Sequence, residues 1–280
     1  NTTGQRNTAV GYRALEDNTG DMNTAVGAYA LPENSTGDNN TAVGRNALRM
    51  NTTASNNTAI GHQALDQNTT GTNNVAVGIQ ALALNTTANN NTALGRVCLY
   101  DNTTGASNTA VGSGVLANNT TADNNTGVGF EALTQNTTGT QNTALGKTAL
   151  QSNTTASYNT AAGSSALYTN TTGEHNTALG RTALYANTTA NNNTAVGSNA
   201  LGSNTTGANN TAVGYAALDA TTTGSENTAV GSSALGANTT GYQNVAMGRY
   251  AGNLITTSHE SVAIGYRSLS QCITGNYNTA

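Results

Sequence analysis

The residues of this chain that most often perform chemistry are too far apart in the sequence to act together. The three histidines, His62, His175 and His259, are separated by several repeats of the pattern described below. Acidic residues such as Asp66 and the pair Glu16–Asp17 could serve as a general acid and base, but isolated acids on a polar chain are more often solvated. We therefore expect no catalytic residue, no metal site and no cofactor, and we predict that the chain is not an enzyme.

The two cysteines are also unsuited to joint chemistry. Cys98 and Cys272 are about ten repeats apart, which corresponds to on the order of 48 Å if each repeat rises by one strand spacing. A disulfide within one straight array is excluded at that distance. Both are predicted to be small buried substitutes for consensus residues.

A 17-residue repeat accounts for almost the whole chain and must position every side chain in it. It reads approximately Asn-Thr-Ala-Val-Gly-x-x-Ala-Leu-x-x-Asn-Thr-Thr-(Gly/Ala)-x-x, and it occurs sixteen times from Asn7 onward. Its first residue is called offset 0 below. Residues 1–280 are interpreted as a single repeat array that drifts from the consensus after about residue 244. Because the chain starts and stops inside a repeat, we expect it to be a piece of something longer.

Composition favours stacking over an ordinary globular core. The 280 residues include one Phe and no Trp, and only 8% are charged, so each repeat must bury its apolar face against its neighbours. The net charge of −4 and the lack of a basic run disfavour nucleic-acid binding. No apolar run approaches the roughly 20 residues that a membrane helix needs, so we expect no membrane insertion.

Charged and aromatic side chains indicate where each coil bends. All of them fall at offsets +5, +6, +9, +10 or +14 to +16, and large or charged groups do not fit a narrow stacked core. Short strands are then expected at offsets +1 to +3, +7 to +8 and +11 to +13. The predicted fold class is all-β, a parallel β-solenoid (a β-roll or β-helix) of about sixteen 17-residue coils with about three short strands per coil.

Alternation along the first strand predicts which side chains face outward. Offset +3 is aliphatic and offset +1 is Thr or Val, and a Thr-for-Val exchange suits a core position, so both are predicted to face the interior. The Ala at offset +2 would then form an outward stripe, which we expect to mediate self-association because only small residues occur there. The proposed stripe comprises Ala25, Ala42, Ala59, Ala76, Ala93, Ala110, Ala144 and Ala178.

Two further columns have predicted structural roles. Asn at offset +11 is expected to face inward and form amide ladders between coils; its members include Asn51, Asn68, Asn85, Asn102, Asn119, Asn136 and Asn153. Gly at offset +4 follows a strand, where a positive φ or a close backbone approach would exclude a Cβ; examples are Gly44, Gly61, Gly78, Gly95 and Gly112.

The repeat motif resembles that of a known family. Asn-Thr-Ala-Val-Gly, and especially Ser261-Val262-Ala263-Ile264-Gly265, resembles the head repeats of trimeric autotransporter adhesins, and the longer 17-residue form is similar to repeats of phage tail-fibre and bacterial surface proteins. The resemblance covers nearly the whole chain. It implies a parallel β-roll or β-solenoid, usually trimeric, that serves as a stalk or adhesive surface outside the cell or on a virion. The adhesin heads repeat with a shorter coil.

Together these observations favour a structural or adhesive fibre segment of an extracellular surface adhesin or phage tail fibre, self-associated as a homotrimer. The expected location is extracellular, on a cell surface or a virion. Its partners would be further copies of itself and possible host surface glycans or protein receptors. Two alternatives remain: a homopolymeric extracellular filament subunit, and an ice-binding β-solenoid that uses an outward file of Thr at offset +12, such as Thr52, Thr69 and Thr86.

Overall fold

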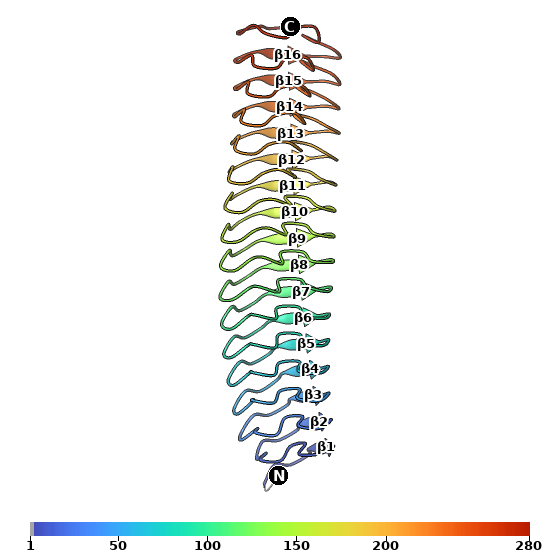
Figure 1. The fold of residues 1–280 in the computed structure, drawn as a ribbon, viewed down its shortest axis with the longest axis vertical. Coiled ribbons are helices and arrows are strands. Elements are labelled where there is room, and N and C mark those ends of the chain that lie inside the picture. Colours follow the sequence, from blue (N-terminus) through green and yellow to red (C-terminus); the bar gives the residue numbers. More distant parts are fainter. Residues whose placement is uncertain (1–2) are drawn as a thin grey trace. The chain divides into compact units, whose positions relative to one another are not determined.

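The computed structural model describes residues 3–280 and shows a parallel β-solenoid. Within each of the two units described below, Figure 1 shows successive coils stacked in the order of the sequence, with one labelled strand in each. None of the described residues is helical. The chain divides into two compact units, residues 1–140 and 141–280, which are described separately.

Each unit contains eight strands of three residues. The strands of the first unit are β1 (Thr8–Val10), β2 (Thr24–Val26), β3 (Thr41–Val43), β4 (Thr58–Ile60), β5 (Val75–Val77), β6 (Thr92–Leu94), β7 (Thr109–Val111) and β8 (Thr126–Val128). Those of the second are β9 (Thr143–Leu145), β10 (Thr160–Ala162), β11 (Thr177–Leu179), β12 (Thr194–Val196), β13 (Thr211–Val213), β14 (Thr228–Val230), β15 (Val245–Met247) and β16 (Val262–Ile264).

Within each unit, every strand pairs in parallel with the strands before and after it, and equivalent residues face each other. Thr41 is opposite Thr58 and Ala42 is opposite Ala59, for example. The partners are one repeat apart, so a single 17-residue repeat makes one complete coil. The residue at offset +14 alternates between Gly and Ala for much of the chain. This alternation does not mean that two repeats make one coil.

The expectation of about three strands per coil is wrong, because only offsets +1 to +3 form a strand. The second expected strand is interrupted by a left-handed conformation at offset +8, as at Leu48, where φ is 51°. In the third segment, the amides of Thr52 and Thr53 both donate to the carbonyl of Thr69, an arrangement that cannot continue as an evenly spaced ladder. Intercoil hydrogen bonds are present there without a strand.

Leucine in a left-handed conformation is unusual, and its burial explains it. The conformation costs roughly 1–2 kcal/mol for a residue with a Cβ, whereas burying a leucine side chain contributes about 1.5–3 kcal/mol. Leu48 and Leu65 are fully buried. The repeat that begins at Asn244 has Gly252 at this offset, with φ 57°, and Ile255 lies in the adjacent space: a Cβ on Gly252 would be 3.0 Å from its Cδ1.

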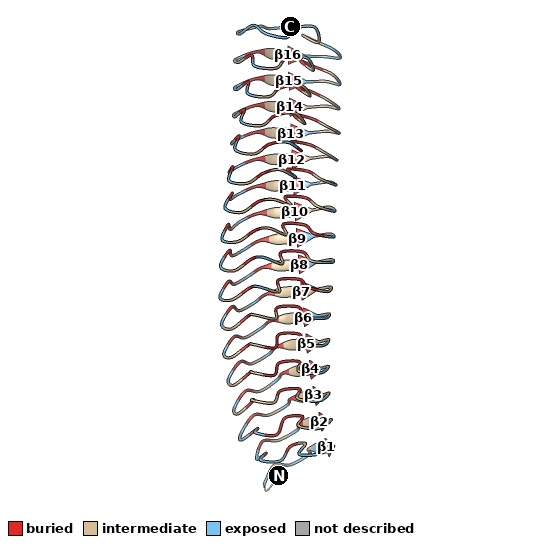
Figure 2. Ribbon diagram, in the orientation of Figure 1, coloured by how far each residue is buried: buried red, intermediate tan, exposed pale blue. Residues whose placement is uncertain are grey.

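The interior of each unit is a narrow column of small side chains. Ala at offsets +2 and +7 and Leu at offset +8 are buried coil after coil, as Ala59, Ala64 and Leu65 illustrate. Figure 2 shows the buried segments recurring at the same place in each coil, with exposed segments at the bends. Beside the strand, the core therefore has room for only a methyl side chain at offset +2.

Candidate interaction surface

The outward face of the strands carries a file of exposed aliphatic side chains at offset +3, flanked by Thr or Val at offset +1. We call these two columns the strand face. From β2 to β16 the residue at offset +1 is half-buried. Ten of the aliphatic residues are between 36% and 59% exposed: Val10, Val26, Ile60, Leu94 and Val128 in the first unit, and Leu145, Leu179, Val213, Met247 and Ile264 in the second.

The predicted outward alanine stripe is wrong, because those alanines point into the core. Ala25, Ala42, Ala59, Ala76, Ala93, Ala110, Ala144 and Ala178 are all 0% exposed. Strand alternation holds, but the two faces are exchanged relative to the prediction. Only small residues occur at offset +2 because the interior is narrow, and offset +3 can vary among Val, Leu, Ile and Met because it lies outside.

One coil shows how tightly this interior is filled. Offset +7 is Val115 instead of the usual Ala, and the neighbouring residue on the next strand is Gly127 instead of Ala. A Cβ on Gly127 would be 2.5 Å from Cγ1 of Val115, closer than two carbon atoms can approach. The larger side chain at 115 therefore occupies the space that the missing methyl group at 127 leaves.

The predicted inward Asn ladder is present in the structure. Asn51, Asn68, Asn85, Asn102, Asn119, Asn136 and Asn153 are all fully buried. The Nδ2 of Asn68 donates to Oδ1 of Asn51 at 2.9 Å, and the Nδ2 of Asn85 donates to Oδ1 of Asn68 at 2.8 Å. The same Nδ2 of Asn68 also donates to the carbonyl of Gly71. These bonds satisfy amides that could not otherwise be buried at low cost.

A second buried ladder, at offset 0, was not predicted. The backbone amide of Asn57 donates to Oδ1 of Asn40, and the Nδ2 of Asn57 donates to the carbonyl of Gly71. The carbonyl of Gly71 thus accepts from both ladders. The signal in the sequence was the near invariance of Asn at the first position of the repeat, which served only to define the register.

Three substitutions interrupt the offset +11 ladder. Thr221, Ile255 and Cys272 occupy ladder positions in the second unit, and none of them can supply the amide donor of Asn. The first two leave an acceptor without a partner. Oδ1 of Asn204 and Oδ1 of Asn238, the preceding members, are buried without a hydrogen-bond partner. These two breaks are local weak points of the second unit.

The glycines at offset +4 take the role predicted for them. In Gly44, Gly61, Gly78, Gly95 and Gly112, φ lies between 130° and 137°, a region open only to glycine. At Gly78, a Cβ would also be 2.3 Å from the carbonyl oxygen of Gly95 in the next coil. Both conformation and close approach therefore require glycine here.

The Thr side chains at offset +12 do not form a row of unbonded hydroxyl groups. Oγ1 of Thr52 donates to the carbonyl of Thr69, and Oγ1 of Thr69 donates to that of Thr86. These side chains are half-buried, whereas the next residue, such as Thr53, is exposed. The hydroxyls at offset +12 hold neighbouring coils together.

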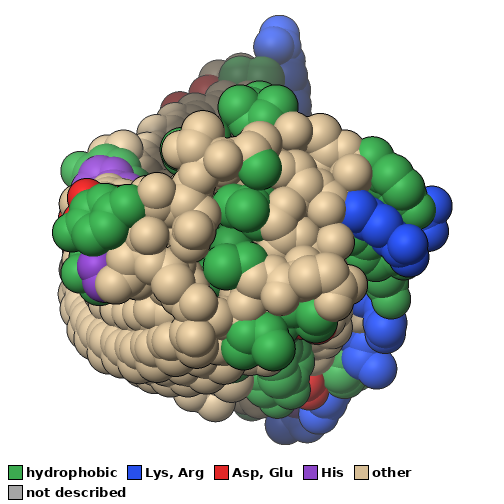
Figure 3. All heavy atoms as spheres, turned by 90° about the horizontal axis from the view of Figure 1, so that it is seen from above, with side chains coloured by type: hydrophobic (Ala, Val, Ile, Leu, Met, Phe, Trp, Pro, Cys, Tyr) green, Lys and Arg blue, Asp and Glu red, His purple; other side chains and the backbone are tan. Residues whose placement is uncertain are grey.

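The charged and histidine side chains lie at the bends. In the C-terminal unit, which faces the viewer in Figure 3, Lys and Arg side chains project on one side and His side chains on another. The rings of Tyr158 and His175 stack at 4.8 Å, as do those of Tyr242 and His259 at 4.7 Å. Among residues 3–280, no group of three His, Cys, Asp or Glu side chains could hold a metal ion.

The cysteines occupy different environments. Burial raises the pKa of the Cys98 thiol to about 11, and its Sγ contacts the carbonyl oxygen of Gly112. Cys272 is half-buried, and both thiols are free.

Comparison with known proteins adds no relative to this description. No family model matches the chain, and no curated protein matches it significantly. No helix that could cross a bilayer is found in the part of the chain that the structure describes. The class that the structure defines is a parallel β-solenoid with a 17-residue coil.

Proposed function

We propose that this chain is a structural fibre segment whose copies assemble side by side through the strand face. The observation that supports the proposal is the column of aliphatic side chains at offset +3, ten of them exposed and the others half-buried, bordered by Thr and Val at offset +1. Exposed aliphatic side chains gathered on one face are typical of a surface that binds a partner.

A second copy is the best-matched occupant of this face. The aliphatic side chains recur at the spacing of parallel strands, about 4.8 Å, and another copy presents the same side chains at the same spacing. Covering one such half-exposed side chain contributes roughly 1 kcal/mol. Association costs roughly 4–15 kcal/mol, so a single coil would contribute too little and a long array is needed.

The resemblance of the repeat motif to trimeric adhesin heads and tail-fibre repeats favours a trimer outside the cell or on a virion. In that setting the chain would be a stalk or adhesive surface, without catalysis. The side chains available for chemistry support a structural role, since they lie at separate bends.

Ice binding is the second candidate, now on a different surface. The strand face combines Thr at offset +1 with aliphatic residues at offset +3 on regularly spaced strands, whereas the hydroxyls at offset +12 are engaged in intercoil bonds. A monomer with thermal hysteresis activity would favour this function over assembly.

The test combines solution mass with a matched pair of variants. Light scattering on a size-exclusion column is applied to the chain and to a triple variant, Ile60→Lys, Leu94→Lys and Val128→Lys, in which cations replace three exposed residues of the strand face. The control triple variant changes three exposed threonines outside the strands, Thr53→Lys, Thr87→Lys and Thr121→Lys.

The proposal predicts an oligomer for the chain and the control, and a monomer with retained β-structure by circular dichroism for the strand-face variant. A monomeric unmodified chain would contradict it, and so would an oligomer that only the control variant disrupts. An open-ended mass that rises with concentration would favour the filament alternative.

A further inference from the structure

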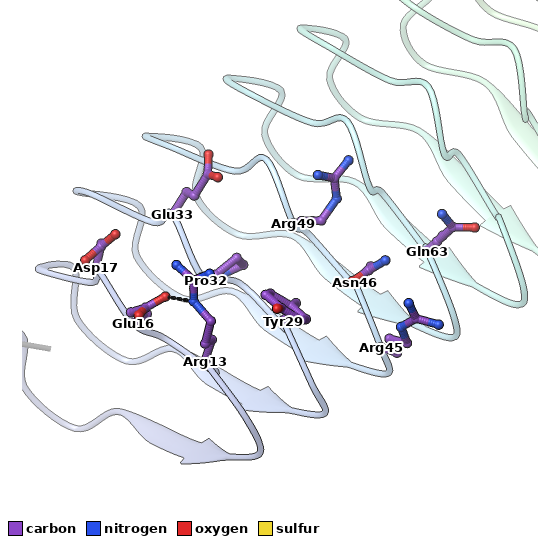
Figure 4. A pocket seen from close by; sticks show the side chains of 10 residues that line it. All are labelled: Arg13, Glu16, Asp17, Tyr29, Pro32, Glu33, Arg45, Asn46, Arg49 and Gln63. Atoms are coloured by element: carbon purple, nitrogen blue, oxygen red, sulfur yellow. Dashed lines mark hydrogen bonds and ion pairs between the residues drawn. The ribbon is translucent and has the colours of Figure 1, made fainter.

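One groove on the outside of the first unit is not explained by assembly. It has a volume of about 510 Å³ and runs across the bends of the first four coils, between the bend after each strand and the bend after each buried Leu (Figure 4). Its volume lies in the range typical of small-molecule sites. It is separate from the strand face.

The polar side chains of the groove are arranged by type. Figure 4 shows Asp17 and Glu33 toward the first two coils, and Arg45, Asn46 and Gln63 toward the third and fourth. Two open carboxylates therefore lie at one end, and an open guanidinium with two side-chain amides lies at the other. Among the described residues, the Asp17 and Glu33 carboxylates and the Arg45 guanidinium make no side-chain hydrogen bond.

Two other arginines of the groove are already held by acids. Arg13 pairs with Glu16. Arg49 makes two hydrogen bonds to the buried carboxylate of Asp66, at 2.8 and 3.1 Å. These pairs fix the walls and cancel most of their own charge. With Arg13 and Arg49 paired in this way, the groove keeps two open carboxylates, Asp17 and Glu33, and one open guanidinium, Arg45.

The floor of the groove is apolar and held in place. Pro32, the only proline of the chain, is buried there. Tyr29 lies beside it, half-buried, with its ring edge-to-face with Tyr12 at 5.4 Å and under the Arg13 guanidinium at 5.5 Å. Rigid apolar surface next to open donors and acceptors suits a ligand with both C–H faces and hydroxyl groups.

We propose that this groove binds an uncharged oligosaccharide. Each sugar hydroxyl can both donate and accept a hydrogen bond, so it can donate to Asp17 or Glu33 and accept from Arg45, Asn46 or Gln63. A ligand of either charge meets a like charge in the groove, an anion at Asp17 and Glu33 and a cation at Arg45. The C–H face of a sugar ring would lie on the accessible part of the Tyr29 ring.

The groove is specific to the first coils because its residues depart from the later repeats. In the repeat that begins at Asn74, the corresponding bends carry Ile79, Gln80, Ala83 and Leu84. None of these four side chains carries a carboxylate or a guanidinium group. The regular repeat supplies the scaffold, and the ligand-binding chemistry comes from its variable positions.

The experiment is saturation-transfer NMR with the full chain and a panel of tetrasaccharides. The neutral probes are the tetramers of glucose, galactose, mannose and N-acetylglucosamine, and the charged probes are the tetramers of galacturonic acid and glucosamine. At least one neutral tetramer is expected to bind more tightly than both charged ones. Absence of saturation transfer to every neutral probe, or tighter binding of a charged one, would overturn the proposal.

Variants locate the binding. Glu33→Ala and Arg45→Ala should each weaken the best neutral probe by about tenfold or more, as expected for the loss of a hydrogen bond to a charged group. Arg96→Ala removes an arginine at the same offset as Arg45 in a coil outside the groove, and it should leave binding unchanged. Equal effects of Arg45→Ala and Arg96→Ala would place the sugar elsewhere. Solution mass is unaffected by these variants, so assembly is tested separately.

Discussion

Val115 and Gly127 provide a sharp test of how the core is packed, because the structure predicts that they compensate for each other. Gly127→Ala places a methyl group 2.5 Å from Cγ1 of Val115, and overpacking of this kind costs about 1–3 kcal/mol. Val115→Ala removes two methyl groups from a fully buried site, with an expected loss of about 2 kcal/mol. The two single losses would sum to about 3–5 kcal/mol if they were independent.

The double variant restores the Ala–Ala pair found in other coils, such as Ala47 with Ala59. We therefore expect it to be within about 0.5 kcal/mol of the unmodified chain, which amounts to a coupling of about 4 kcal/mol. Repeat arrays unfold in parts, so the assay is native-state hydrogen exchange at amides bonded between the coils of β7 and β8, such as those of Thr109 and Gly129. Each single variant should accelerate their exchange by about thirtyfold, and the double variant should not. Additive losses in the double variant would refute the packing argument.

Three further predictions concern the ladders, the turns and the thiols. Thr221→Asn should raise the free energy of unfolding of the second unit by about 1 kcal/mol net, and with it the urea midpoint, because it supplies the donor that Oδ1 of Asn204 lacks; an unchanged or lower midpoint would argue against the ladder as a stabilising element. Gly78→Ala should lower the melting temperature more than Gly265→Ala, since both glycines have positive φ but only Gly78 would place a Cβ against backbone; equal effects would show that conformation alone matters. Burial raises the pKa of Cys98 to about 11, so its thiol stays protonated at pH 8 and Ellman's reagent should modify one thiol in the folded chain and two in denaturant; two rapid reactions in the folded chain would contradict the buried assignment.

The fold was predictable because the repeat constrains it. Fixed Gly, Leu and Asn columns indicated a stacked solenoid with an inward Asn ladder, and Asn68 and Asn85 occupy that ladder in the structure. The facing of the strand was not predictable from Thr-for-Val exchange at offset +1, because β-branched residues also suit an exposed strand. The decisive quantity, the width of the interior beside Ala59, depends on how Leu65 packs.

The number of strands per coil and the position of the groove could not be predicted from the repeat, because both depend on how side chains pack in three dimensions. Leu48 has no intrinsic preference for positive φ, so its left-handed conformation follows from burial and could not be inferred from its type. The groove combines Asp17, Glu33, Arg45 and Gln63 from four different coils. Their placement at bends was predicted from their offsets, but their proximity across coils was not.

The central claim is that the strand faces of different copies lie against each other, and pulsed electron spin resonance measures this directly. Replacing Cys98 by Ala and Cys272 by Asn, the consensus residues at those offsets, leaves no thiol, and Ile60→Cys then gives one spin label per chain on the strand face. Any dipolar coupling must come from another copy. The account predicts strong coupling for the label at position 60, and weaker coupling for a label introduced by Thr53→Cys, outside the strand in the same repeat. Absence of coupling at position 60, or stronger coupling at position 53, would contradict it.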